Sequence, residues 1–132
     1  MEVAVARGQL ALNVRDVESA SRFYEKLFGV PPAKRMPDYV NFAIADPPLK
    51  LVLIEGEGQG GTLNHLGIEV ESAEEVRSAS ERLAGSGLEV TTEESVACCY
   101  ALQDKVWVRA PDMAPWEVYT VLEDLPAGAR CC

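Results

Sequence analysis

The strongest constraint on the fold of this chain is that it repeats itself. The segment Gln9–Asp16 aligns with His65–Ser72 at an offset of 56 residues. Over 9–30 against 65–86, six of 22 aligned pairs are identical, whereas ordinary residue usage gives roughly one or two. The identical pairs are Leu10/Leu66, Val14/Val70, Glu18/Glu74, Glu25/Glu81, Leu27/Leu83 and Gly29/Gly85. Such a repeat predicts two copies of one supersecondary unit.

Each copy predicts the same order of elements. An initial strand is followed by an amphipathic helix, over 17–27 and 73–83, with Gly29 and Gly85 as helix stops. Three further strands are expected near 32–36, 39–45 and 49–55 in the first copy and near 88–94, 103–110 and 116–122 in the second. The glycine-rich run 56–61 reads as a flexible connector. We therefore expect one α+β domain over 1–132, with βαβββ modules at 1–56 and 62–124 and a flexible tail at 125–132.

Alternation within the first strand of each copy predicts which side chains meet. Side chains of a strand point alternately to its two faces, so Gln9 lies opposite the apolar stripe that faces the helix. His65, the one histidine of the chain, holds the same place in the second copy. Pairing the modules about a pseudo-twofold axis would curl a mixed sheet into a cup, with helices on its outer face and Gln9 and His65 at its centre.

An acid in the last expected strand supplies a third polar group. Glu117 stands in the otherwise apolar run Pro115–Tyr119, where a buried carboxylate needs a partner. Two simpler interpretations stay open from the residues alone. His65 suits a hydrogen-bonded structural role, and Glu117 suits an edge strand that faces water.

Charge narrows the classes of partner. Twelve Lys and Arg against 21 Asp and Glu give a net charge of −9, which repels nucleic acid and anionic membranes. Apolar runs such as 51–54 are far too short to span a bilayer, which takes about 20 residues. The acidic start of the chain is unlike a secretory signal, so a cytoplasmic location is expected.

The four cysteines stand in two adjacent pairs, Cys98–Cys99 and Cys131–Cys132. A disulfide between neighbours closes a cramped ring, so each pair is expected to carry thiols or to bind a soft ligand rather than to bridge itself. For Cys98 and Cys99, small apolar side chains that fill a gap are the alternative.

Several longer stretches resemble a known family. The chain is similar to the vicinal oxygen chelate superfamily of glyoxalases, bleomycin-resistance proteins and dioxygenases, and within it to the organoarsenical carbon–arsenic lyases and their cadmium-induced relatives. The stretches that carry the resemblance are 12–16, 23–29, 41–45, 47–55, 64–70 and 98–108, together with 115–119. The resemblance implies a glyoxalase-like fold around a divalent metal.

By position, the resemblance implies that Gln9, His65 and Glu117 are the metal ligands. It implies Fe(II) as cofactor, replaceable in vitro by Ni, Co, Zn or Cd, and O₂ as co-substrate. Leu51 falls where glyoxalase-type isomerases have a fourth ligand. Three protein ligands leave coordination positions open for O₂ and substrate, as in non-haem Fe(II) oxygenases.

The implied reaction is cleavage of the carbon–arsenic bond of methylarsonous acid and trivalent aromatic arsenicals, which yields arsenite and confers resistance. Cys98 and Cys99 would hold the thiophilic arsenic, provided a turn brings both sulfurs to one side. A candidate gating loop comprises Tyr100, Ala101, Leu102 and Gln103, and Cys131 and Cys132 are candidate auxiliary thiols. Two alternatives stay open, a glyoxalase-like metal isomerase or epimerase and a non-catalytic thiol protein that binds cadmium or arsenic. Both a monomer and a homodimer fit.

Overall fold

The computed structural model describes residues 6–111 and 114–126. Its elements, in chain order, are β1 (Arg7–Val14), α1 (Val17–Phe28), β2 (Lys34–Met36), β3 (Tyr39–Ile44), β4 (Leu49–Glu55), β5 (Thr62–Glu69), α2 (Ala73–Gly85), β6 (Val90–Cys98), β7 (Ala101–Arg109) and β8 (Pro115–Asp124). This order is two successive βαβββ modules, so the predicted α+β class is confirmed. The chain forms two compact units, Arg7–Leu66 and the remainder from Gly67.

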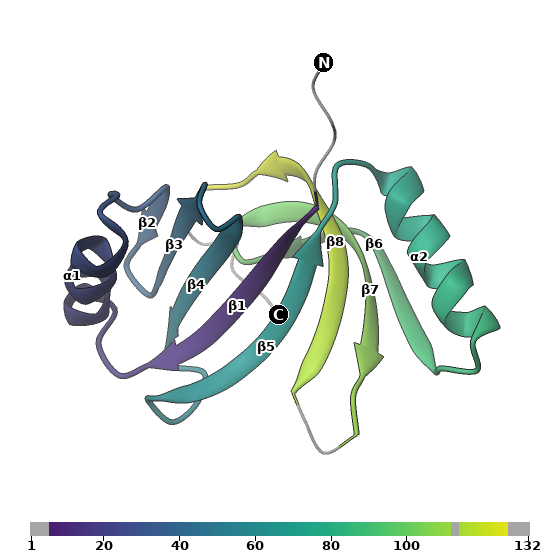
Figure 1. Ribbon diagram of the computed structural model, residues 1–132, viewed down its shortest axis with the longest axis horizontal. Coiled ribbons are helices and arrows are strands. Elements are labelled where there is room, and N and C mark those ends of the chain that lie inside the picture. Colours follow the sequence, from purple (N-terminus) through teal and green to yellow (C-terminus); the bar gives the residue numbers. More distant parts are fainter. Residues whose placement is uncertain (1–5, 112–113, 127–132) are drawn as a thin grey trace. The chain divides into compact units, whose positions relative to one another are not determined.

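The N-terminal unit is a mixed sheet with the strand order β2-β3-β4-β1-β5 (Figure 1). β1 runs parallel to β4, and β3 is antiparallel to both β2 and β4. Helix α1 contacts β3 and β4. The predicted alternation in β1 is confirmed, because its even-numbered apolar residues pack on the core beneath α1. The buried members of that core are Val17, Val40, Phe42, Ile44, Leu51 and Leu53.

Both ends of α1 follow from local chemistry. The Asp16 carboxylate accepts a hydrogen bond from the backbone N–H of Glu18 at 3.2 Å, and the Glu55 carboxylate accepts one from Val17 N–H at 2.8 Å. These contacts satisfy donors that the first helical turn leaves exposed. The Ser19 hydroxyl and then the Glu18 N–H lower the pKa of Asp16 below its ordinary value of 3.8. Gly29, with a φ of 73°, ends the helix as predicted.

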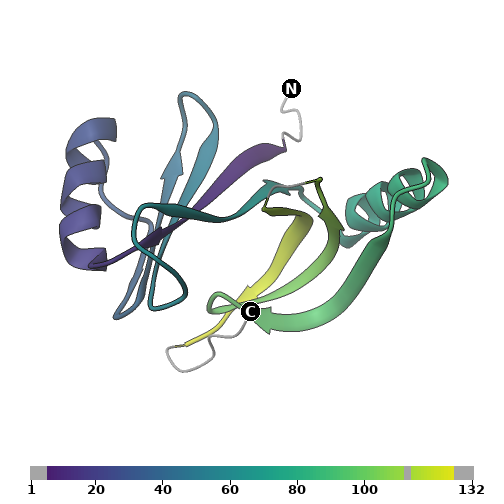
Figure 2. The ribbon, with the colours of Figure 1, turned by 90° about the horizontal axis from the view of Figure 1, so that it is seen from below.

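The C-terminal unit joins β8, β7 and β6 as an antiparallel sheet that carries α2 (Figure 2). Its buried core residues are Val76, Ala79, Val106 and Val118. Ser72 caps α2 by accepting from Glu75 N–H at 3.2 Å, while Glu75 reaches back to Glu71 N–H at 3.0 Å. Helix α2 ends at Gly85, as expected, but Gly85 is its last helical residue and not the left-handed stop that the sequence predicts. Gly87 takes the left-handed conformation, with a φ of 89°.

The largest difference from the expected elements concerns β6 and β7. β6 runs on to Cys98 through an irregularity between Glu93 and Val96. Only Cys99 and Tyr100 separate it from β7, and Cys98 pairs with Ala101. The expected loop over 100–103 is therefore one turn residue followed by the first three residues of a strand. A two-residue hairpin turn suits the twist of its strands when both residues have positive φ, as they do here at 53° and 63°.

Among the described residues, no helix is long and apolar enough to cross a membrane.

Candidate functional site

Gln9 and His65 lie side by side within the N-terminal unit. Each is 5% exposed, and Gln9 Nε2 lies 3.2 Å from His65 Nε2. The other ring nitrogen, Nδ1, lies 2.7 Å from Asn64 Oδ1. β1 and β5, the first strands of the two repeats, thus bring together the two residues that occupy equivalent positions.

Glu117 belongs to the C-terminal unit and is paired with a cation that the sequence analysis did not single out. Lys105 Nζ lies 2.7 Å from Glu117 Oε1, and the two side chains are 1% and 4% exposed. In the antiparallel register Lys105 faces Tyr119, so it is the diagonal neighbour of Glu117. The alternative in which Glu117 faces water on an edge strand is wrong, because the carboxylate is buried.

Aromatic side chains surround the Lys105 cation. Its Nζ lies 5.2 Å from the centroid of the Trp107 ring and 5.9 Å from that of Tyr119. Both distances lie within the range of cation–π attraction. The Trp107 indole N–H in turn donates to Glu93 Oε1 at 3.0 Å. The ammonium is therefore held by a carboxylate and two ring faces, which offsets part of the cost of its burial.

Cys98 and Cys99 have the turn that binding by both sulfurs requires. Cys98 is the last residue of β6 and Cys99 the first of the turn, so their side chains converge, and their Sγ atoms lie 4.0 Å apart. Two sulfurs on one tetrahedral zinc, each at about 2.3 Å, are about 3.8 Å apart, so the spacing suits a single soft atom between them. The expectation that this pair carries thiols is wrong for Cys98, which is disulfide-bonded in the structure, and is confirmed for Cys99. Binding through both sulfurs therefore requires reduced protein.

The backbone of this turn is fixed from two sides. Gln103 Nε2–H donates to the Cys98 carbonyl at 2.7 Å, and Leu125 N–H donates to the Tyr100 carbonyl at 2.8 Å. Gln103 is 4% exposed and Tyr100 is 4% exposed. Residues 100–103, predicted as a gating loop, thus lie in a hydrogen-bonded hairpin. The second thiol pair, Cys131 and Cys132, lies outside the described residues.

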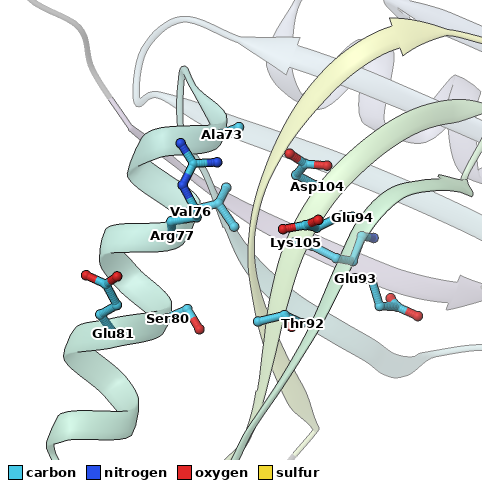
Figure 3. Close-up of a pocket in the computed structure, with 10 residues that line it drawn as sticks. All are labelled: Ala73, Val76, Arg77, Ser80, Glu81, Thr92, Glu93, Glu94, Asp104 and Lys105. Atoms are coloured by element: carbon cyan, nitrogen blue, oxygen red, sulfur yellow. The ribbon is translucent and has the colours of Figure 1, made fainter.

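A separate hollow of about 150 Å³ opens between α2 and the strands β6 and β7. Figure 3 shows Arg77 on the helix side and Glu94 and Asp104 on the strand side of it. None of the predicted metal or arsenic ligands lines this hollow. We assign no ligand to it.

The donor chemistry fits a divalent metal. An imidazole and a carboxylate are typical ligands of non-haem Fe(II). Two cis ligands of an octahedral metal, each at about 2.1 Å, lie about 3.0 Å apart, close to the 3.2 Å between the Gln9 and His65 nitrogens. Turning the Gln9 amide over would present its oxygen at that place. Across residues 6–111 and 114–126, no three His, Cys, Asp or Glu side chains are grouped to hold a metal.

The position expected for a fourth ligand is apolar. Leu51 is 1% exposed and packs in the core beneath α1. In the parallel register Gln9 pairs with Lys50 and Ala11 with Val52, so these two residues of β4 lie beside the Gln9 face. Neither of these two side chains carries a carboxylate.

The family follows from comparison with known proteins. Residues 6–118 match the model of the Glyoxalase/Bleomycin resistance protein/Dioxygenase superfamily. The chain belongs to this superfamily. Among solved structures, the 2,3-dioxygenase LapB from Pseudomonas sp. KL28 aligns with a TM-score of 0.68 at 18% identity, over 97% of this chain and 45% of that one. A Mn(II)-bound glyoxalase from Novosphingobium aromaticivorans aligns at 0.64 and 15%, over 92% and 42%. These likenesses confirm the glyoxalase-like fold.

Curated relatives within the superfamily are much nearer in sequence. The cadmium-induced protein CadI of Mycobacterium tuberculosis (strain H37Rv) is 58% identical over 120 residues, 91% of this chain and 79% of the relative. The trivalent organoarsenical cleaving enzyme of Thermomonospora curvata is 54% identical over 134 residues, 97% and 89%. A relative from Bacillus sp. (strain MD1) with the same name is 41% identical over 129 residues, 93% and 80%. The narrower resemblance predicted from sequence is thereby confirmed.

Proposed function

We propose that this protein is an Fe(II)-dependent dioxygenase of the cytoplasm that cleaves the carbon–arsenic bond of trivalent organoarsenicals and so confers resistance to them. The observation that carries the proposal is the pair of sulfurs at Cys98 and Cys99, 4.0 Å apart on one hairpin turn. Relatives named trivalent organoarsenical cleaving enzymes support it.

The thiol pair accounts for substrate capture. A monosubstituted trivalent arsenical, R–As(OH)₂, has two exchangeable hydroxyl groups. Reaction with two cysteine thiols forms two As–S bonds and releases two waters, so the carbon substituent is the one group left on arsenic besides sulfur. Methylarsonous acid and trivalent aromatic arsenicals both meet this requirement. Because Gln103 and Leu125 hold the turn, both sulfurs are oriented before substrate arrives.

Gln9, His65 and Glu117 are the proposed ligands of Fe(II), which when bound supplies a site for O₂ beside the substrate. Lys105 lies 2.7 Å from the Glu117 carboxylate and balances its charge, which offsets part of the cost of burying that charge. With O₂ as oxidant the methyl reaction balances as CH₃As(OH)₂ + O₂ → As(OH)₃ + HCHO. One oxygen atom goes to arsenic and the other to carbon.

Arsenic speciation tests the proposal. Reduced protein loaded with Fe(II) is incubated with methylarsonous acid in air and, in parallel, without oxygen. Arsenite should accumulate only in air, with one formaldehyde for each arsenite. Unchanged methylarsonous acid in both incubations would overturn the proposal and favour a thiol-based binding protein, a reading consistent with the relative named cadmium-induced. Turnover of a hemithioacetal or an epimerisable thioester, without O₂, would favour the isomerase alternative.

The two thiol pairs provide a matched comparison. Cys98→Ser should lose arsenite formation, because a hydroxyl binds arsenic far more weakly than a thiolate does. Cys131→Ser makes the same chemical change in the second pair and, with the protein fully reduced, should leave turnover unchanged. Equal losses in both variants would contradict the assignment of the hairpin pair as the substrate ligands.

A further inference from the structure

A chain of hydrogen bonds runs from the connector between β4 and β5 to His65. The Thr62 hydroxyl donates to the Gln59 carbonyl at 2.6 Å. Asn13 Nδ2–H donates to Thr62 Oγ1 at 2.9 Å, and Asn64 Nδ2–H donates to Asn13 Oδ1 at 2.9 Å. Asn64 Oδ1 then lies 2.7 Å from His65 Nδ1. Every member belongs to the N-terminal unit.

The direction of this chain is set by its first bond. A backbone carbonyl can only accept, so the Thr62 hydroxyl donates its one hydrogen to the Gln59 carbonyl and must accept a hydrogen bond from Asn13. Asn13 therefore presents its NH₂ group to Thr62 and its oxygen to Asn64. By the same rule Asn64 presents NH₂ to Asn13 and its oxygen to His65. An amide oxygen can only accept, so the His65 hydrogen must sit on Nδ1.

We propose that Asn64 is a positioning residue that fixes neutral His65 as its Nδ1–H tautomer and keeps the Nε2 lone pair available to a divalent metal. The metal part of this inference rests on the proposed function, whereas the tautomer does not. In the structure that lone pair faces Gln9 Nε2–H at 3.2 Å. Nδ1–H is the minor tautomer of free histidine in water, so a specific acceptor is needed to hold it. Metal-binding histidines in general gain affinity from such a partner.

The surroundings favour a built network over a chance contact. Asn13 is 6% exposed, and its backbone carbonyl also accepts from Gly61 N–H at 2.9 Å. A Cβ atom added at Gly58 would come within 2.8 Å of Asn13 Nδ2, so glycine allows the connector to close on this amide. The run 56–61, expected as a flexible connector, therefore also orients the network.

The single histidine of the chain makes the tautomer directly measurable. In a long-range ¹H–¹⁵N spectrum of metal-free, ¹⁵N-labelled protein at about pH 8.5, where imidazole is neutral, the imidazole region contains only the two ring nitrogens of His65. The wild-type spectrum should show a protonated Nδ1 and an unprotonated Nε2. Asn64→Leu should move the hydrogen to Nε2 in most molecules. Asn64→Asp keeps a hydrogen-bond acceptor at the same place, so this variant should retain the Nδ1–H form.

Two further variants test whether the hydrogen-bond network from Gln59 to His65 acts as a unit. Thr62→Val removes the hydroxyl that sets the direction, and it should produce a mixture of tautomers although it does not touch His65. Thr91→Val makes the same change on an exposed part of β6 and should leave the spectrum unchanged. A wild-type protein with Nε2 protonated, or an Asn64→Leu spectrum equal to that of wild type, would overturn the proposal. Far-UV circular dichroism confirms that each variant is folded.

Metal affinity gives a second readout that needs no turnover. Co(II) binding to the metal-free protein, measured by competition with a chromogenic chelator, should weaken about 10- to 100-fold in Asn64→Leu and stay within a few-fold of wild type in Asn64→Asp. Equal Co(II) affinity in all three proteins would refute the positioning role. If the tautomer and the affinity change as predicted but no arsenical is cleaved, the proposed reaction fails and this inference stands.

Discussion

The buried ion pair between Lys105 and Glu117 allows the sharpest test of how buried charges contribute to the free energy of unfolding. Removal of one partner of a buried ion pair leaves an uncompensated charge, which costs about 3–5 kcal/mol. Lys105→Met keeps the length of the side chain and the packing on Trp107 and removes the charge, so this full cost is expected. It is a large share of the roughly 5–15 kcal/mol by which a domain of this kind is stable.

A double-mutant cycle separates the charge from the packing. Lys105→Met combined with Glu117→Gln removes both charges at nearly constant volume, so the double variant should be more stable than Lys105→Met alone, with a coupling energy of about 2–3 kcal/mol. Urea unfolding of metal-free protein, followed by tryptophan fluorescence, measures each free energy of unfolding. The exposed pair between Arg35 and Glu18, 3.6 Å apart, is the control, and Arg35→Met should cost under about 1 kcal/mol. Additive effects of the two buried changes would refute the reasoning.

Three further predictions follow from other contacts. Because the pKa of Asp16 is lowered, its ionised carboxylate stabilises the folded protein above pH 3.8 and loses that effect as the pH falls through the lowered pKa. The difference in free energy of unfolding between wild type and Asp16→Asn, measured by urea titration, should therefore shrink below that pH. A constant difference would contradict this prediction. Gly58→Ala should displace the Asn13 amide, so the ring nitrogen spectrum should show mixed tautomers of His65, and an unchanged spectrum would refute the contact. Cys99→Asn should raise the free energy of unfolding by about 1 kcal/mol, because Asn tolerates the positive φ of this position. The same variant should lose arsenical binding in a dialysis assay. A lower free energy of unfolding would argue against backbone strain in this turn.

Strand alternation and the repeat were enough to place Gln9 beside His65. The amphipathic pattern of α1 and its glycine stop were equally readable. These features are local or periodic, so they can be recognised in a single sequence. The predicted cup, as a common centre for all three metal ligands, stays a prediction, since Gln9 and His65 belong to one compact unit and Glu117 to the other.

Features that depend on cross-strand register escaped the sequence analysis. The sequence predicts a strand only near 88–94, so the extension of β6 to Cys98 was missed. The irregular segment of β6 is held by Asp104 Oδ1, which accepts from Ser95 N–H at 2.7 Å. The turn at Cys99 contains neither Gly nor Asn, the usual signals for positive φ. Lys105 meets Glu117 only through the diagonal of the β7–β8 register. A lysine in an apolar strand near a buried acid is the signal that could have indicated this pair.

The measurement that tests the central claim most directly is the ratio of bound iron and bound arsenic to protein, determined together by elemental analysis of reduced protein under anaerobic conditions. Glu117→Ala and His65→Ala should lose iron and keep one arsenic per chain, whereas Cys98→Ser and Cys99→Ser should lose arsenic and keep iron. Full iron in Glu117→Ala, or full arsenic in Cys98→Ser, would contradict the account.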